Sequence, residues 1–136
     1  MSKNFLALDY GTKRIGVAMN MASLVEPLFV INHDAQSSNG EVSQEVLTQL
    51  QALCQEKKID EIVLGISEND MAAKTTVFAK QLTRLLQLPV RLHDETLSSA
   101  EVQARLREAG VNLSRHQGPI DHYAAALILE DFLAIT

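Results

Sequence analysis

The sequence predicts an α/β fold built on a mixed five-stranded sheet. Three antiparallel strands come first, helices and strands then alternate, and helices cover both faces. Two observations predict this class. Strand-like stretches precede residue 33, and from residue 42 onward apolar residues at helical spacing alternate with short apolar runs. The 136 residues contain no repeat and no linker rich in Pro and Ser, so we expect a single domain over residues 1–136.

The first part of the chain predicts three strands, at residues 5–9, 15–19 and 28–31. The first two lie so close in sequence that a hairpin is expected around Gly11, Thr12 and Lys13. Residues 33–40 (HDAQSSNG) are polar and predict a loop.

The remaining elements follow from periodicity and from residues that begin or end helices. A helix is expected from Val42 to about residue 58, a buried strand over 61–66, a second helix over 72–88 and a strand over 90–93. Pro89 should end the second helix. A capping-box spacing of Ser98 and Glu101 predicts a third helix, which Gly110 should end near residue 109. Pro119 and the run IDHYAAALILEDFL predict a last apolar helix.

Composition limits the classes of function. The net charge is −5, which argues against tight binding of nucleic acid by the whole surface but allows a local basic rim around an acidic centre. The single Cys54 excludes an internal disulfide. Since the start of the chain has no signal-peptide pattern and no apolar run is long enough for a membrane helix, we expect a cytoplasmic protein without membrane contact.

Acidic residues lie where predicted strands end or helices begin, which is where side chains converge in α/β folds. Asp9 ends the first strand, Asp94 and Glu95 follow the fifth, and Asp121 is in the first turn of the last helix beside Ala124. Small alanines would let that helix approach the sheet. Clustered carboxylates repel one another unless a cation joins them, and their hard oxygens favour Mg²⁺ or Mn²⁺. Alone, each acid is better explained as a residue that stabilises a helix N-terminus or ends a strand in solvent, and the spacing by itself does not make a site.

The segment LDYGTKRIG is more specific. It lacks the Gly-Lys-Ser/Thr of a P-loop and the glycine spacing of a dinucleotide fingerprint. It combines a strand, an acid, a tight turn at Gly11 and a basic pair, Lys13 and Arg14, that can face phosphate.

Three segments, LALDYGTKRIGVAM, LHDETLSSAEVQARLREAG and IDHYAAALILEDFL, resemble the YqgF family of RuvC-related nucleases. The resemblance implies an RNase H-like fold and a two-metal-ion phosphodiesterase that binds two Mg²⁺ or Mn²⁺ ions. Its metal ligands and catalytic residues would be Asp9, Glu95 (rather than Asp94) and Asp121. It further implies 5′-end processing of the small-subunit (16S) ribosomal RNA precursor, or resolution of Holliday junctions. The implied substrate-binding residues are Gly11, Thr12, Lys13, Arg14 and Arg115.

The chain departs from the family pattern in three places. The loop after Gly65 is several residues shorter, Thr96 replaces an Arg, and Arg115 and His116 stand where a Lys is common. These departures motivate an alternative hypothesis, a weakened or inactive module that binds RNA or protein. A third reading is a relative of the actin and sugar-kinase fold that binds nucleotide. The sequence leaves open RNA or DNA as substrate, endo- or exonuclease action, and a monomer or a homodimer.

Overall fold

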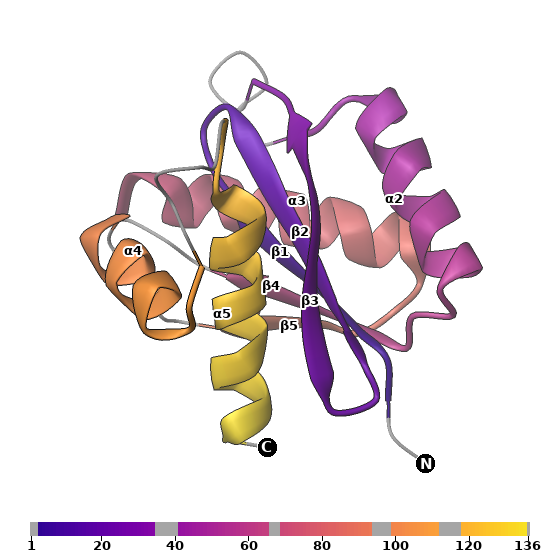
Figure 1. Cartoon of the computed structure of the whole chain (residues 1–136). Helices are drawn as coiled ribbons and strands as arrows, with labels where there is room; N and C mark the ends of the chain where they lie inside the picture. The colour runs from indigo at the N-terminus through magenta and orange to yellow at the C-terminus, as the bar shows by residue number, and fades with distance from the viewer. Residues whose placement is uncertain (1–2, 35–40, 66–68, 94–98, 112–117, 136) are drawn as a thin grey trace.

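The computed structural model describes residues 3–34, 41–65, 69–93, 99–111 and 118–135. Within these ranges the predicted class is confirmed: five strands form one mixed sheet in the order β3-β2-β1-β4-β5 (Figure 1). The strands are β1 (Phe5–Tyr10), β2 (Arg14–Met21), β3 (Leu24–Asn32), β4 (Glu61–Gly65) and β5 (Val90–His93). The first three pair antiparallel, whereas β4 runs parallel to β1 and β5 runs parallel to β4.

The third strand is longer than the predicted range of residues 28–31. It pairs with β2 along nearly its whole length, across a register shift between Val17 and Ala18. Pro27 lies inside it, which is possible because β3 is an edge strand and needs no N–H donor on its outer side. The proline and the register shift therefore hid the first half of this strand from the alternation pattern.

The described helices are α2 (Gln44–Glu56), α3 (Asn69–Leu86), α4 (Ser99–Glu108) and α5 (Asp121–Ala134). The prediction that Pro89 directly ends α3 was wrong by two residues, since Gln87 already has a positive φ of 55°. The residue before a proline disfavours helical geometry, so the helix closes earlier. Gly110 ends α4 as predicted: its φ is 86°, and the next amide, of Val111, donates to the carbonyl of Leu106. Ser98 lies outside the described residues.

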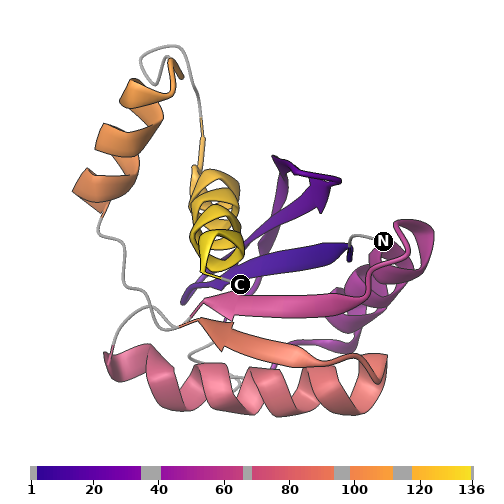
Figure 2. The same ribbon diagram turned by 90° about the horizontal axis from the view of Figure 1, so that it is seen from below.

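The helices cover both faces of the sheet, as predicted. Leu6, Leu8 and Tyr10 of β1 point into a core shared with α2 and α3, whereas Phe5 and Ala7 point to the opposite face and pack with α5. Viewed from below, α3 and α5 lie on opposite sides of the sheet, and α4 stands away from the sheet beside α5 (Figure 2). Asp9 therefore belongs to the face that α5 covers.

Helix α4 is attached to α5 rather than to the sheet. Val102 and Leu106 of α4 pack with Leu127 of α5 in a small apolar cluster. The guanidinium of Arg105 donates two hydrogen bonds of 2.9 Å to the two carboxylate oxygens of Asp131. This paired geometry fixes the direction of α4 relative to α5.

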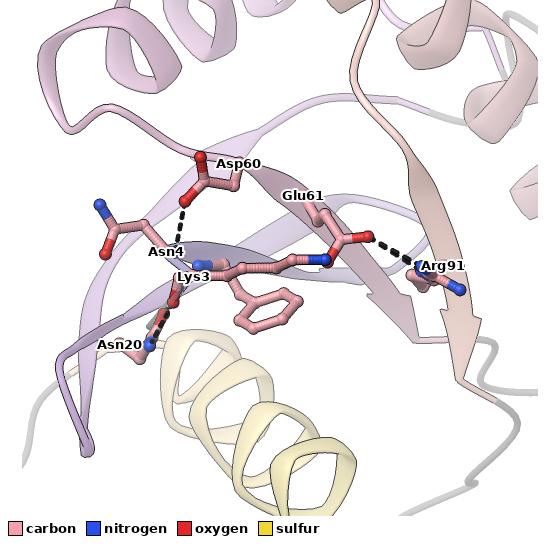
Figure 3. A network of polar contacts seen from close by, with 7 residues as sticks. Lys3, Asn4, Asn20, Asp60, Glu61 and Arg91 are labelled. Atoms are coloured by element: carbon pink, nitrogen blue, oxygen red, sulfur yellow. Dashed lines mark hydrogen bonds and ion pairs between the residues drawn. The ribbon is translucent and has the colours of Figure 1, made fainter. Parts of the chain in front are cut away.

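A polar network closes the end of the sheet opposite Asp9 (Figure 3). Glu61, at the start of β4, is buried and accepts hydrogen bonds from Arg91 at 3.0 Å and from Lys3 at 3.2 Å. Burial raises the pKa of Glu61, but the hydrogen bonds from Arg91 and Lys3 outweigh it, and the net shift is downward. Asn20 anchors the chain start by accepting from the Phe5 amide at 2.7 Å. Among the described helices, none is long and apolar enough to cross a membrane.

Candidate metal centre at the end of the first strand

Asp9 occupies a row of residues that crosses the sheet at the ends of β1, β4 and β5. Its register partners are Gly16 on β2 and Gly65 on β4, and Gly65 is in turn paired with His93 on β5. Cross-strand partners point to the same face, so the Asp9 side chain lies between two positions without side chains. No side chain therefore projects from the sheet on either side of Asp9, on the face that α5 covers.

These two glycines let α5 approach the carboxylate. A Cβ at Gly16 would lie 1.9 Å from the carbonyl oxygen of Asp121, which only a glycine allows. A Cβ at Gly65 would lie 2.6 Å from Cδ1 of Ile128, two turns further along α5. The expectation that small residues bring the last helix close to the sheet is confirmed by Ala125, which is fully buried there. Asp121 is thus placed beside Asp9 by backbone contact.

The electrostatics of Asp9 reflect this placement. Burial, and secondly the negative charge of Asp121, raise the pKa of Asp9 from 3.8 to about 6. No described residue forms a hydrogen bond or an ion pair with the Asp9 side chain. The fold therefore holds a carboxylate in a position that disfavours its charge, which is the behaviour expected of a group awaiting a cation.

Asp121 has a protein partner. Nε of Arg14 donates to its Oδ2 at 2.9 Å, in a pair whose side chains are 45% and 24% exposed. The sequence analysis predicted that Arg14 binds substrate phosphate, whereas in the structure its side chain forms an ion pair with Asp121, a predicted metal ligand. Because only Nε is used, the terminal nitrogens of the guanidinium have no hydrogen-bond partner among the described residues. Within the same limits, the second oxygen of Asp121 has none.

The predicted phosphate-facing turn joins β1 to β2. The Gly11 amide donates to the Arg14 carbonyl at 2.9 Å, and a Cβ at Gly11 would lie 2.9 Å from that same oxygen. The tight closure explains why a glycine stands there. Thr12 is half-buried, and Lys13 and Arg14 are exposed at the turn. Four of the five predicted substrate residues are therefore contiguous beside Asp9, and Arg115 lies outside the described residues.

The predicted third acid, Glu95, also lies outside the described residues, as do Asp94 and Thr96. Among the residues that are described, no group of three or more Asp, Glu, His or Cys side chains is gathered as a metal site. The two carboxylates nevertheless suit a hard divalent cation. Asp9 from β1 and Asp121 from α5 provide the oxygens, and the charge of Asp9 has no positive partner among the described residues. In sequence, Glu95 lies two residues after His93, which belongs to the same cross-sheet row as Asp9.

Sequence reasoning missed Gly16 and Gly65 as parts of this site. The available signal was a glycine inside a predicted strand, which often marks the close approach of another backbone. It did not show what approaches each glycine, which is the backbone of Asp121 at Gly16 and the side chain of Ile128 at Gly65. That information is in the register of β1 with its two neighbours.

Comparison with known proteins identifies the family. The family model RuvX, described as Holliday junction resolvase, matches residues 3–135. A protein of Anaeromyxobacter sp. strain Fw109-5, named "Putative pre-16S rRNA nuclease", is 33% identical over 137 residues, covering 95% of each chain. The predicted resemblance to the YqgF family is confirmed by these matches.

Solved structures support the fold. The Holliday junction resolvase of fowlpox virus is similar with a TM-score of 0.58 and 13% identity, covering 98% of this chain and 99% of that one. T. thermophilus RuvC in complex with a Holliday junction substrate is similar with a TM-score of 0.55 and 13% identity, covering 98% and 96%. At this identity the likeness concerns the fold, and it confirms the predicted RNase H-like class.

Proposed function

The chain belongs to the RuvX family, and on that premise we propose that it is a divalent-metal-dependent nuclease that hydrolyses phosphodiester bonds in structured nucleic acid. Its proposed substrate is the 5′ region of precursor 16S ribosomal RNA in the cytoplasm, as the names of its relatives suggest. The second candidate substrate is a Holliday junction, which would be cleaved by the same phosphodiester hydrolysis. Residues 1–136 would act as one domain, as a monomer or a homodimer.

The observation that carries the proposal is the Asp9 carboxylate. It lies between two glycines, under the first turn of α5, with a pKa raised to about 6 by burial and by Asp121. An acid that served only to end a strand would point to water, where its charge is stable. Here the chain keeps two acids together at the end of the sheet, although their charges repel.

Asp9, Glu95 and Asp121 would hold two Mg²⁺ or Mn²⁺ ions. When bound, such ions activate a water molecule for attack on phosphorus and stabilise the leaving oxygen. The protein supplies position and charge. The backbone contact at Gly16 fixes where Asp121 lies, and Arg14 fixes one of its oxygens, so the other is free to face a ligand.

Substrate contacts are proposed for the β1–β2 turn. Exposed Lys13 and the unused terminal nitrogens of Arg14 provide positive charge beside the carboxylates, and Gly11 and Thr12 provide a close backbone approach. Arg115 is proposed to extend this rim. Since the whole chain carries a charge of −5, affinity for phosphate would depend on these few residues. We therefore expect recognition of a structured site rather than binding along any strand.

The experiment that tests the proposal compares two end-labelled substrates, a precursor 16S RNA fragment with its 5′ extension and a four-way DNA junction. Each is incubated with wild type, Asp121→Asn or Glu130→Gln in Mg²⁺, in Mn²⁺ and in EDTA. Glu130 is an exposed acid on the same helix and serves as the matched control. Loss of even an outer partner of a metal ligand costs roughly 10–100-fold, so Asp121→Asn should lose at least that much.

The outcomes separate the candidate functions. Metal-dependent cutting of the RNA that fails only in Asp121→Asn supports the proposed substrate. Paired cuts in the junction would move the proposal to resolution, which needs a symmetric dimer. No cleavage of either substrate by folded wild type would contradict the proposal and favour the RNA- or protein-binding module that the changes at Thr96 and after Gly65 suggest.

A further inference from the structure

The end of β3 is attached to the β1–β2 turn through one residue, His33. Its backbone amide donates to the Lys13 carbonyl at 2.9 Å, continuing the ladder between β2 and β3. Its ring Nε2 lies 2.6 Å from the Gly11 carbonyl oxygen. A carbonyl can only accept, so Nε2 carries the proton and donates it. One histidine therefore binds the carbonyl groups on both sides of Thr12.

The surroundings of the ring favour the neutral form. The ring lies 5.0 Å from the ring of Tyr10, which stacks on Phe78 at 4.6 Å in the core on the α2 and α3 side. Nδ1 is buried and has no hydrogen-bond partner among the described residues. Burial lowers the pKa of His33, against the opposing effects of the Gly11 carbonyl and of Asp34. The neutral ring with its proton on Nε2 is therefore the form that fits this arrangement.

The turn held by His33 carries the basic residues of the candidate site. Gly11 closes it by donating to the Arg14 carbonyl, and the Arg14 side chain reaches Asp121. Without the ring, the Gly11 carbonyl would lose its partner and the turn would be held on the β3 side by the Lys13 carbonyl alone. The ring thus fixes the end of the turn from which Thr12, Lys13 and Arg14 extend.

We propose that His33 is a positioning residue of this nuclease, which donates its ring N–H to the Gly11 carbonyl and so orients the turn that presents Lys13 and Arg14 to substrate phosphate. The role rests on the proposed function, because it supposes that this turn meets nucleic acid. Among the described residues, His33 forms no hydrogen bond with Asp9 or Asp121. Its loss should therefore weaken substrate binding and leave metal binding unchanged.

The test uses two substitutions at the same position. His33→Phe keeps a ring beside Tyr10 but has no donor, whereas the amide nitrogen of His33→Gln can reach the Gly11 carbonyl. On the precursor 16S RNA fragment, His33→Phe should raise KM about tenfold, the size of one lost hydrogen bond. Its kcat and its Mn²⁺ affinity by calorimetry should change by less than about threefold. His33→Gln should restore KM to within about threefold of wild type.

A readout independent of cleavage accompanies the kinetics. Hydrogen exchange at the Gly11 amide should speed up about tenfold in His33→Phe and not in His33→Gln. Long-range ¹H–¹⁵N spectra of wild type should show the proton on Nε2. Unchanged Gly11 exchange in His33→Phe, or a proton on Nδ1, would overturn the positioning role. If wild type cleaves nothing but the exchange pattern holds, the proposed function fails while the link from His33 to the turn stands.

Discussion

Replacing Asp9 by Asn should stabilise the metal-free protein. The pKa of Asp9 is about 6 in the fold and 3.8 ordinarily, because burial and Asp121 disfavour its charge. The stability that protonated Asp9 contributes is therefore fully present below pH 3.8 and is lost as the pH rises through 6, where the side chain becomes charged in the fold. One pKa unit corresponds to about 1.36 kcal/mol, so the charged side chain costs at most about 3 kcal/mol at pH 8. Asn removes that charge, although its amide must find hydrogen bonds and will keep part of the cost.

Urea unfolding followed by circular dichroism in EDTA measures this difference. The free energy of unfolding of Asp9→Asn should exceed that of wild type by about 1–3 kcal/mol at pH 8, and the gain should fall toward zero near pH 4. The control is Glu26→Gln, an exposed acid on the edge strand β3, which should show no comparable gain. An Asp9→Asn protein that is no more stable than wild type at pH 8, or a gain that is equal at both pH values, would show that the charge of Asp9 does not destabilise the fold.

Four further substitutions test contacts that hold the fold and the site together. Gly16→Ala should cost more than about 3 kcal/mol and detach the start of α5, since its Cβ meets backbone. Gly65→Ala meets only a flexible side-chain end and should cost less; equal urea midpoints for the two variants would contradict this ranking. Glu61→Gln should lose about 1–3 kcal/mol at neutral pH and progressively less as the pH falls, because its pKa is lowered in the fold. Its Mn²⁺ affinity by calorimetry should stay that of wild type, and a large drop would show that the two ends of the sheet are coupled. Arg105→Ala should cost only about 0.5–1 kcal/mol but accelerate hydrogen exchange within α4, whereas unchanged exchange would show that the pair with Asp131 does not hold that helix.

The fold could be predicted from the sequence because its signals are local. The apolar run of β1, helical spacing in α2 and a glycine after α4 each report on a few neighbouring residues. The order of the strands was not among the predictions: β4 pairs with β1 and lies between β1 and β5. The beginning of β3 was missed because Pro27 and the register shift near Val17 break the pattern there. The end of α3 was misplaced because Gln87 leaves the helix before the proline acts.

Individual residues of the candidate site could be predicted from the sequence, but the contacts that place them could not. Asp9 and Asp121 were expected to meet, and the structure places them together through contacts that no local pattern encodes. The missing side chains at Gly16 and Gly65 decide how closely α5 approaches, and their meaning appears only once the strands are in register. The pairing of Arg14 with Asp121 likewise joins residues 107 positions apart. His33 was assigned to a polar loop, because a hydrogen bond to a distant carbonyl leaves no trace in composition.

The most direct test of the central claim is cleavage of the end-labelled precursor 16S RNA fragment by Asp9→Asn and wild type in Mn²⁺, with EDTA as the blank. We expect metal-dependent cutting by wild type and a loss of at least roughly 100-fold in the variant. The variant should at the same time be the more stable protein, so the loss could not be assigned to unfolding. Cutting that persists in Asp9→Asn, or that continues in EDTA, would contradict the claim that these carboxylates hold the catalytic metal ions.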